Sequence, residues 1–209
     1  MGQLKMQFTR LIALGAVLAA ATSCGDAVRT GSAPVVLTVN QLQAAPGGGH
    51  GANQFVSTLF SDVQVLITTP APCTPTTPCP TIYADNGQAI LGMAPKDPAI
   101  APTAINQVTI NRVHIKFVRA DGRNVQGVDV PYEFDGAATG TIPANGTLTL
   151  GFELVRHAAK EEPPLVNLIN SSSIITTIAQ VTFYGSDLAG NQVSVMGQIT
   201  VDFGNFGDQ

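Results

Sequence analysis

Apolar residues recur at every second position in several parts of this sequence. In the segment 146–154 the even-numbered residues from Leu148 to Leu154 are apolar, and Thr147, Thr149 and Glu153 lie on the opposite parity. The segment 193–203 repeats the pattern on its odd positions, with Gly197 as the small residue among them. Successive side chains of a strand point to opposite faces, so this period predicts antiparallel strands with one buried face. At Gly197 we expect a bulge or a close approach of another backbone.

Other stretches carry the same signal. In 128–135 the residues Val128, Val130, Tyr132 and Phe134 are assigned to one apolar face. The parity of the apolar residues changes within 107–118, so we expect a bulge or a strand break at 111–112. The remaining expected strands are 35–41, 62–68 and 178–185.

Turn residues separate these runs. Asp121-Gly122 is expected to connect 113–118 with 125–130, Asn145-Gly146 to precede the strand at 146–154, and Asn86-Gly87 to mark a turn. The segment 86–105 is expected to be a long loop or ordered insertion, and one helical turn is expected near 163–170. Together these features predict an all-β antiparallel sandwich of about seven to nine strands, forming a single domain over 34–209.

A further motif lies near the C-terminus. An apolar strand that includes Val181 and Phe183 is followed by Asp187-Leu-Ala-Gly190-Asn191 and by a second apolar strand. This arrangement resembles the closing hairpin of bacterial Ig-like and fibronectin-III-like domains. The resemblance implies an Ig-like sandwich, although the Cys…Trp…Cys core of antibody domains is absent because the chain has no Trp.

The composition excludes two classes of protein. Charged residues make up 11% of the chain, against about 25% in ordinary soluble domains, and the net charge is −4. A nucleic-acid-binding protein needs a basic surface to offset phosphate charge, so we expect no nucleic-acid partner. No apolar run reaches the roughly 20 residues of a membrane-spanning helix.

Residues 1–23 have the organisation of a signal peptide. Lys5 and Arg10 precede an uncharged apolar stretch, 11–21, which is followed by Ala21-Thr22-Ser23-Cys24. This ending resembles the lipobox of bacterial lipoproteins, although Ala21 stands where that family usually has Leu. The alternative is an ordinary secretory signal with an incidental cysteine.

The lipobox resemblance implies that Cys24 is lipidated and that residues 24–33 tether the domain to a membrane. Gly25 follows the cysteine, which in the sorting rule of that family implies the outer membrane of the bacterial envelope. Both the periplasmic and the surface side of that membrane remain open.

Cys73 and Cys79 are the remaining cysteines, and they lie in a segment with five prolines at positions 70–80. In an oxidising compartment this spacing favours a disulfide that closes a small loop. A metal site or a redox pair is the alternative. Redox pairs favour C-x-x-C, and no further ligands for a metal lie nearby in the sequence.

Several acidic residues are candidates for chemistry. Glu133 and Asp135 alternate along one expected strand, and Asp129 shares their parity. Carboxylates at this spacing suit glycoside hydrolysis, and with Asp129 they suit calcium binding. The simpler interpretation is a solvent-exposed strand face. Asp187 and Asn191 could also ligate calcium, but Asp187 is expected to bond the backbone of its own turn.

The histidines indicate no catalytic motif. His50 lies in a glycine-rich loop without the Lys-Ser/Thr of a phosphate loop, and His114 is expected on a solvated strand face. His157 belongs to the cluster 156–162, which is interpreted as helix-surface pairs or as a binding patch. No nucleophile elbow or zinc motif is present, so we expect neither an enzyme nor a cofactor.

These observations favour a non-enzymatic, lipid-anchored envelope protein that acts as a structural or protein-interaction module with an envelope protein partner. The alternative is a ligand-binding or adhesion module that recognises a glycan or acts with calcium. Glycan sites commonly stack sugars on Trp or Tyr, and this chain has no Trp and three Tyr.

Overall fold

The computed structural model describes residues 31–49 and 51–207. Strands account for 51% and helices for 7% of the chain, and the antiparallel sheets form an all-β sandwich, as the alternation predicts. Eleven strands lie within the described ranges: three form one main sheet, six form the other, and two form a separate hairpin.

The smaller main sheet, sheet A, has the order β1-β5-β9. β1 (Val35–Ala45) and β9 (Leu148–Val155) each pair antiparallel with the central strand β5 (Asp85–Pro95). In β9 the side chains of Leu150, Phe152 and Leu154 are buried, so the alternation read from this segment is confirmed.

The larger sheet, sheet B, has the order β2-β11-β10-β6-β7, and β8 also pairs with β6. Its strands are β2 (Thr58–Asp62), β6 (Val108–Val118), β7 (Phe134–Gly136), β8 (Gly140–Ile142), β10 (Ile175–Asp187) and β11 (Gln192–Gly204). The pairing of β2 with β11 is parallel, whereas an antiparallel arrangement was expected throughout. Thus β1 is an edge strand of sheet A, whereas β2, the next strand along the chain, is an edge strand of sheet B.

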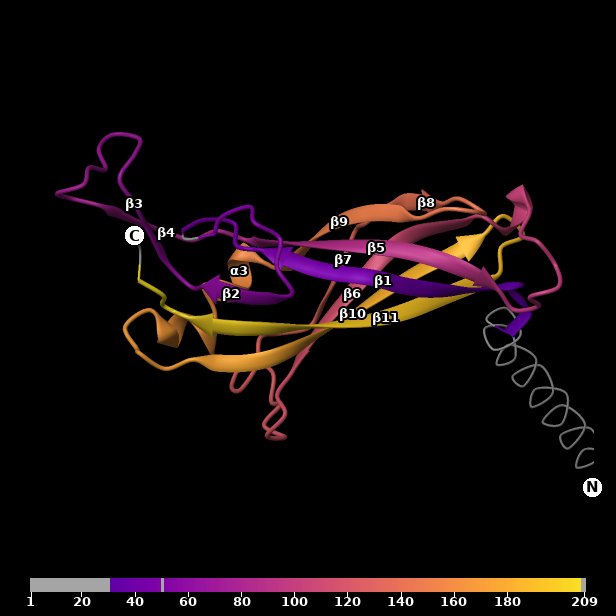
Figure 1. Cartoon of the computed structure of the whole chain (residues 1–209). Helices are drawn as coiled ribbons and strands as arrows, with labels where there is room; N and C mark the ends of the chain where they lie inside the picture. The colour runs from indigo at the N-terminus through magenta and orange to yellow at the C-terminus, as the bar shows by residue number, and fades with distance from the viewer. Residues whose placement is uncertain (1–30, 50, 208–209) are drawn as a thin grey trace, which may run out of the picture.

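The two main sheets lie one over the other as two layers (Figure 1). Their apolar side chains pack into one core. Edge-to-face aromatic pairs join strands within and across the layers: Phe117 contacts Phe203 within sheet B, and Phe152 of sheet A contacts Phe183 of sheet B. Gly197 lies where the side chains of Leu42 and Val39 of β1 approach β11, so the close contact here is with side chains, whereas the approach of another backbone was expected. β10 and β11 pair without a register shift, so no bulge occurs there.

The change of apolar parity in 107–118 is a bulge within one continuous strand. Tyr184 pairs with Arg112 and Gly185 with Ile110, so Asn111 is the extra residue of β6. This position agrees with the expected irregularity at 111–112.

β5 corrects one expectation. The segment 86–105 was expected to be a loop with a turn at Asn86-Gly87, but residues 85–95 form the central strand of sheet A. Gly87 faces the Phe152 ring so closely that an added Cβ atom would lie 2.4 Å from it. Small inward residues, Gly87 and Ala89, weaken the apolar alternation here, and the strand was missed for that reason.

The expected strands 62–68 and 128–135 also differ. Of the first, Asp62 is the last residue of β2, and residues 65–67 form the separate short strand β3 (Val65–Ile67), which pairs with β4 (Cys79–Thr81) instead of joining sheet B. In the second, only residues 134–136 form a strand, and Val128 and Tyr132 are 66% and 48% exposed. The alternation in 128–133 thus belongs to a loop, and Asp121-Gly122 turns the chain into that loop and not into a hairpin.

Helical structure is confined to short segments. The 3-10 helix η2 (Leu165–Leu168) lies within the helical turn expected at 163–170, and both terminal leucines are buried. α3 (His157–Lys160) precedes it, and a second 3-10 helix, η1 (Ala104–Asn106), precedes β6. No helix in the described part of the chain is long and apolar enough to cross a membrane.

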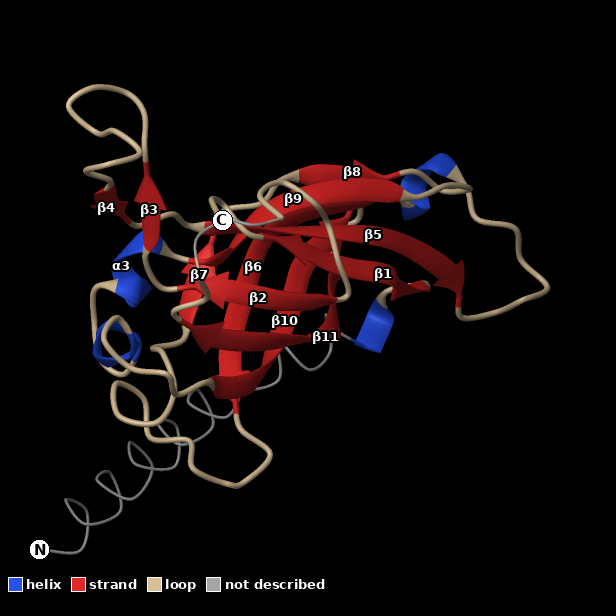
Figure 2. Cartoon of the chain, turned by 60° about the vertical axis from the view of Figure 1, so that its left-hand side comes forward, coloured by secondary structure: helices blue, strands red, loops and turns tan. Residues whose placement is uncertain are grey.

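The two ends of the sandwich differ. At one end, here called the tether end, the start of the described chain contacts the β10–β11 turn, because the Ser32 hydroxyl donates to Asn191 at 2.8 Å. At the opposite end, here called the pocket end, lie β2, the β3–β4 hairpin, α3 and the end of β11 (Figures 1 and 2). The thirteen residues of β11 run between the two ends, which corresponds to about 40 Å at the usual strand rise.

Candidate functional site

An open pocket of about 460 Å³ lies at the pocket end of the sandwich. Three segments build it: the loop that follows β1, the strand β2, and the residues that follow β11. Most of the lining is apolar or glycine backbone. The lining residues are Pro46, Gly48, Gly51, Gln54, Val56, Phe60, Asp62, Phe206 and Gly207.

Two aromatic rings form a corner of this pocket. The centroids of Phe60 and Phe206 lie 5.7 Å apart and their planes are nearly perpendicular, at 85°. Phe60 points away from the core, because its neighbours Leu59 and Ser61 occupy the inward positions of β2, and it is 57% exposed. Such a ring on the outer face of an edge strand presents apolar surface to solvent.

Asp62 supplies the charge of the pocket. It is the charged residue among the described lining residues, and its Oδ1 atom accepts hydrogen bonds from the backbone N–H groups of Gln64 (3.3 Å) and Phe206 (3.4 Å). The same carboxylate therefore connects β2 to the segment that carries the second aromatic ring.

A buried ion pair lies behind the pocket. Lys160 Nζ is 2.9 Å from Asp85 Oδ2, and both side chains are only 1% exposed. The Ser61 hydroxyl donates to Asp85 Oδ2 at 2.5 Å, and the Gly47 N–H donates to Asp85 Oδ1 at 3.1 Å. Lys160 also donates to the carbonyl oxygen of Asp62 at 2.8 Å. We call these residues the polar clamp.

The polar clamp connects the two walls of the pocket. Gly47 belongs to the loop that supplies Pro46 and Gly48, whereas Ser61 and Asp62 belong to β2. Removing two charges from water carries a desolvation penalty of several kcal/mol for each ion. A buried ion pair is therefore weak evidence that the folded state is stabilised, but its short contacts define how the connected segments lie. The clamp fixes the position of loop 46–56 relative to β2.

The interpretation of Lys160 as part of a helix-surface cluster is wrong, because its side chain is buried in the polar clamp. His157 does lie at the surface, where its Nδ1 atom is 3.6 Å from Glu161, and this pair has the expected one-turn spacing. Arg156 packs its guanidinium over the Phe134 ring at 4.2 Å. The cluster 156–162 is thus divided between the interior and the surface.

Glu133 and Asp135 lie beside Arg, His and Lys side chains of β6. Asp135 Oδ1 is 3.1 Å from His114 Nδ1 and 3.3 Å from Arg112, and Glu133 is 3.9 Å from Lys116. His114 is at the outer face of sheet B, as expected. The carboxylates are therefore partnered across the β6–β7 pair, which corresponds to the simpler interpretation of a solvent-exposed face.

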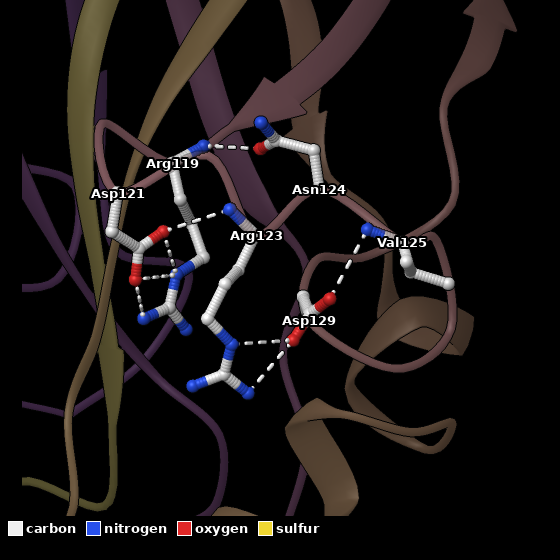
Figure 3. Close-up of polar contacts among 6 residues, drawn as sticks. All are labelled: Arg119, Asp121, Arg123, Asn124, Val125 and Asp129. Carbon is white, nitrogen blue, oxygen red and sulfur yellow. Dashed lines mark hydrogen bonds and ion pairs between the residues drawn. The ribbon is translucent and has the colours of Figure 1, made fainter.

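Asp129 belongs to a different group of contacts, in the loop between β6 and β7 (Figure 3). Its carboxylate accepts from Arg123 Nε at 3.1 Å and from the Val125 N–H at 3.2 Å, and it is largely buried. Asp129 therefore does not share a face with Glu133 and Asp135, because residues 128–133 are not a strand.

In the same loop, Arg119 and Asp121 form a second pair, with Arg119 Nη2 2.5 Å from Asp121 Oδ2 (Figure 3). The hydrogen bonds from the Arg119 side chain, followed by the one from the Arg123 N–H, lower the pKa of Asp121 below its usual value. The bond with Asp121 in turn raises the pKa of Arg119.

Asp187 bonds its own turn, as expected. Its Oδ1 atom accepts from the Asn191 N–H at 2.8 Å, and its Oδ2 atom accepts from the Asn191 side-chain amide at 2.7 Å. Gly190 in this turn has φ +83°, a conformation that favours glycine. Within the described residues, no group of three or more His, Cys, Asp or Glu side chains is arranged to hold a metal ion.

Cys73 and Cys79 form the expected disulfide, with an S–S distance of 2.02 Å. It closes the projecting segment between β3 and β4, away from the main core. Cys24, the expected lipidation site, and His50 lie outside the described residues.

Comparisons of the chain with protein-family models, curated proteins and solved structures found no match.

Sequence reasoning missed the pocket residues Phe60, Asp62 and Phe206. The sequence contained one signal for Phe60. Leu59 and Phe60 are adjacent apolar residues in β2, so one of them must lie on the solvent side, and an aromatic residue there departs from the expected alternation. The approach of residue 206 to residue 60 depends on the parallel pairing of β2 with β11, and a local pattern does not predict such a pairing.

Proposed function

We propose that this chain is a non-enzymatic, lipid-anchored protein of the bacterial envelope that binds a partner protein through the pocket at its membrane-distal end. The observation that carries the proposal is the position of the pocket. The described chain begins at the tether end, where Ser32 contacts Asn191, whereas Phe60 and Phe206 lie at the opposite end. A lipid on Cys24 would thus hold the tether end at the membrane and direct the pocket away from it.

The finer fold assignment belongs to the same proposal. Sheet A, β1-β5-β9, has the order expected for strands A, B and E of an Ig-like domain, and β11-β10-β6 has the order of G, F and C. β2 leaves the first sheet to pair parallel with the last strand. We propose that the chain is Ig-like, with the β3–β4 arm as an insertion after β2.

Exposed apolar side chains support a protein partner at the pocket end. Phe55, Val56, Phe60 and Leu66 are all exposed there, beside the pocket. Apolar groups gathered around a concave surface are typical of interaction sites. The ordered clamp behind the pocket keeps these walls in place in the unbound protein, which lowers the conformational cost of binding.

In-cell photo-cross-linking tests the proposal. A benzoylphenylalanine at Gln54, inside the pocket, is expected to yield a defined adduct with one partner protein. The matched control carries the same group at Leu188, which is 64% exposed in the turn at the tether end. Equal patterns from the two positions, or no adduct from Gln54, would contradict the proposal.

Cys24→Ala tests the anchor separately, because it removes the thiol that receives the lipid. We expect the variant to move from the membrane fraction to the soluble envelope fraction. Unchanged membrane association would contradict the lipoprotein assignment. It would not affect the proposal of a partner protein, which the cross-linking experiment tests separately.

A small-molecule-binding or adhesion module is the second candidate. The pocket volume favours it, because ligand pockets commonly measure about 300–1,000 Å³. A low-molecular-mass compound that copurifies with the native protein and contacts Phe60 would support this candidate over the first.

A further inference from the structure

The connections at the tether end of the sandwich carry no charged side chains. Three segments form them, here called the tether loops: 98–107, which includes η1, the turn 143–147 between β8 and β9, and the turn 188–192 between β10 and β11. None of these segments contains Asp, Glu, Lys, Arg or His. At the opposite end, charged side chains are present within 119–123 after β6 and within 157–162 at α3.

Strand pairing brings the tether loops together. Asp187 of β10 and Ile142 of β8 both pair with Val108 of β6. The turns that follow Asp187 and Ile142 therefore lie beside the end of the segment 98–107, which leads into Val108. The loops thus lie close to one another although they come from three parts of the chain.

Large apolar side chains of the tether loops are exposed. Ile100, Ile105 and Leu188 are 63%, 60% and 64% exposed, and none of them belongs to the main core cluster. Exposed apolar groups without charges among them are typical of an interaction surface. They suit the boundary between lipid headgroups and acyl chains, where apolar side chains are favoured and charged ones are costly.

The proposed lipid is close to these loops along the chain. Gly31 is the seventh residue after Cys24, so the backbone between them spans at most about 25 Å. The Gly31 carbonyl accepts from Lys96 Nζ at 3.1 Å, two residues before the segment 98–107. A lipid on Cys24 therefore keeps the tether loops within reach of the bilayer, whereas β11 extends about 40 Å toward the pocket end (Figure 1).

We propose that the tether loops lie on the lipid bilayer and insert Ile100, Ile105 and Leu188 into its headgroup layer. This inference rests on the lipid anchor of the proposed function and adds a second, non-covalent contact with the same membrane. A lipid on a flexible tether holds a domain at the membrane but leaves its tilt free. The tether loops fix that tilt, so the pocket is presented to a partner protein at a constant height.

Fluorescence quenching by lipid tests the contact. The lipidated protein is purified from cells and reconstituted in vesicles of phosphatidylethanolamine and phosphatidylglycerol that contain nitroxide-labelled lipids. Leu188→Cys or Ile105→Cys carries a nitrobenzoxadiazole group. The introduced cysteine is the reactive thiol, because Cys73 and Cys79 form a disulfide and the proposal places the lipid on Cys24.

Val128→Cys is the matched control, labelled in the same way. Val128 is also apolar and is 66% exposed, but it lies in the loop that follows β6, at the other end of the sheet. We expect nitroxide lipids to quench the label at positions 105 and 188 about threefold more strongly than at 128. A second copy of this chain carries no nitroxide, so contact between copies does not produce this result. Equal quenching at the three positions overturns the inference.

A second experiment changes the apolar side chains themselves. The label is placed at Ile100→Cys, and Ile105→Ser/Leu188→Ser is combined with it. We expect quenching at position 100 to fall about threefold, because the remaining loops hold the bilayer less well. Val125→Ser/Val128→Ser, which changes exposed residues away from the tether loops, leaves the quenching unaltered. Thermal unfolding checks that each variant is folded, and threonine replaces serine in a variant that fails. Unaltered quenching in Ile105→Ser/Leu188→Ser overturns the inference.

Flotation of the vesicles separates this contact from the anchor. Protein that floats with the vesicles but shows no quenching at positions 105 and 188 overturns the inference and leaves the lipid anchor standing. Protein that does not float removes the anchor, and the inference with it. A defined protein adduct from benzoylphenylalanine at Leu188 in cells would assign this end to a protein partner and overturn the lipid contact.

Discussion

The ammonium group of Lys160 lies 2.9 Å from the carboxylate of Asp85, and the two side chains are equally inaccessible to solvent. Lys160 is at the end of a four-residue helix, and Asp85 begins the central strand of sheet A. Through Gly47, Ser61 and the Asp62 carbonyl, this pair contacts both walls of the pocket. A chain with 11% charged residues thus places two of its charges in its interior, beside the pocket at the pocket end.

Lys160→Met is expected to lower the free energy of unfolding by about 3–5 kcal/mol, because it leaves the Asp85 charge buried without its cation. Urea unfolding followed by circular dichroism measures the change. In Lys160→Met/Asp85→Leu both charges are absent, and part of the stability returns. Lys96→Met, which removes an exposed lysine that donates to the Gly31 carbonyl, is the control and changes stability little. A Lys160→Met variant as stable as this control would contradict the role of the clamp.

Gly87→Ala is expected to destabilise the sandwich by about 1–3 kcal/mol, because the new methyl group overlaps the Phe152 ring. Gly151 pairs with Gln88 on the neighbouring strand, and nothing lies within 4 Å of its added Cβ. Gly151→Ala is therefore neutral or slightly stabilising. Thermal unfolding of both variants is the measurement. Similar melting temperatures would show that the close contact of Gly87 with Phe152 does not require glycine at position 87.

The pair Cys73→Ala/Cys79→Ala is expected to leave the main unfolding transition almost unchanged. The arm between β3 and β4 contributes no residue to the main core cluster, so its cross-link orders the arm itself. Limited proteolysis is the measurement, and cleavage within 69–81 becomes faster in the variant. Cleavage that begins in β10 or β11 instead would indicate that the disulfide supports the whole domain.

Acid titration of Asp121 tests the contacts in Figure 3. The Arg119 side chain, and secondarily the Arg123 N–H, lower the pKa of this carboxyl below its usual 3.8. Since the folded-state pKa is the lower one, the stabilisation is present above pH 3.8 and is lost as the pH falls through the folded-state pKa. Carbon NMR of the carboxyl should give a midpoint below 3.8. Arg119→Gln raises that midpoint and Arg112→Gln does not, and an unshifted midpoint in Arg119→Gln would contradict the assignment.

The strands with large inward residues were predictable from the sequence. Leu150, Phe152 and Leu154 alternate with polar residues, and this local pattern is sufficient because each side chain reports the face on which it lies. Other local signals were also sufficient: the turn residues for the turn at Asp187 and Asn191, the cysteine spacing for the Cys73–Cys79 disulfide, and the change of apolar parity for the irregularity at Asn111. β5 was not, because its inward Gly87 and Ala89 are small enough to resemble a loop.

By itself the sequence determined an all-β chain with a particular set of half-buried strands, because period-two alternation is a property of neighbouring residues. The tertiary structure alone decided the pocket. Phe60 meets Phe206 only because β2 pairs in parallel with β11, and Lys160 reaches Asp85 only because α3 and β5 converge at the same end. These contacts join residues far apart in the chain, and their positions depend on how the two sheets close over their shared core.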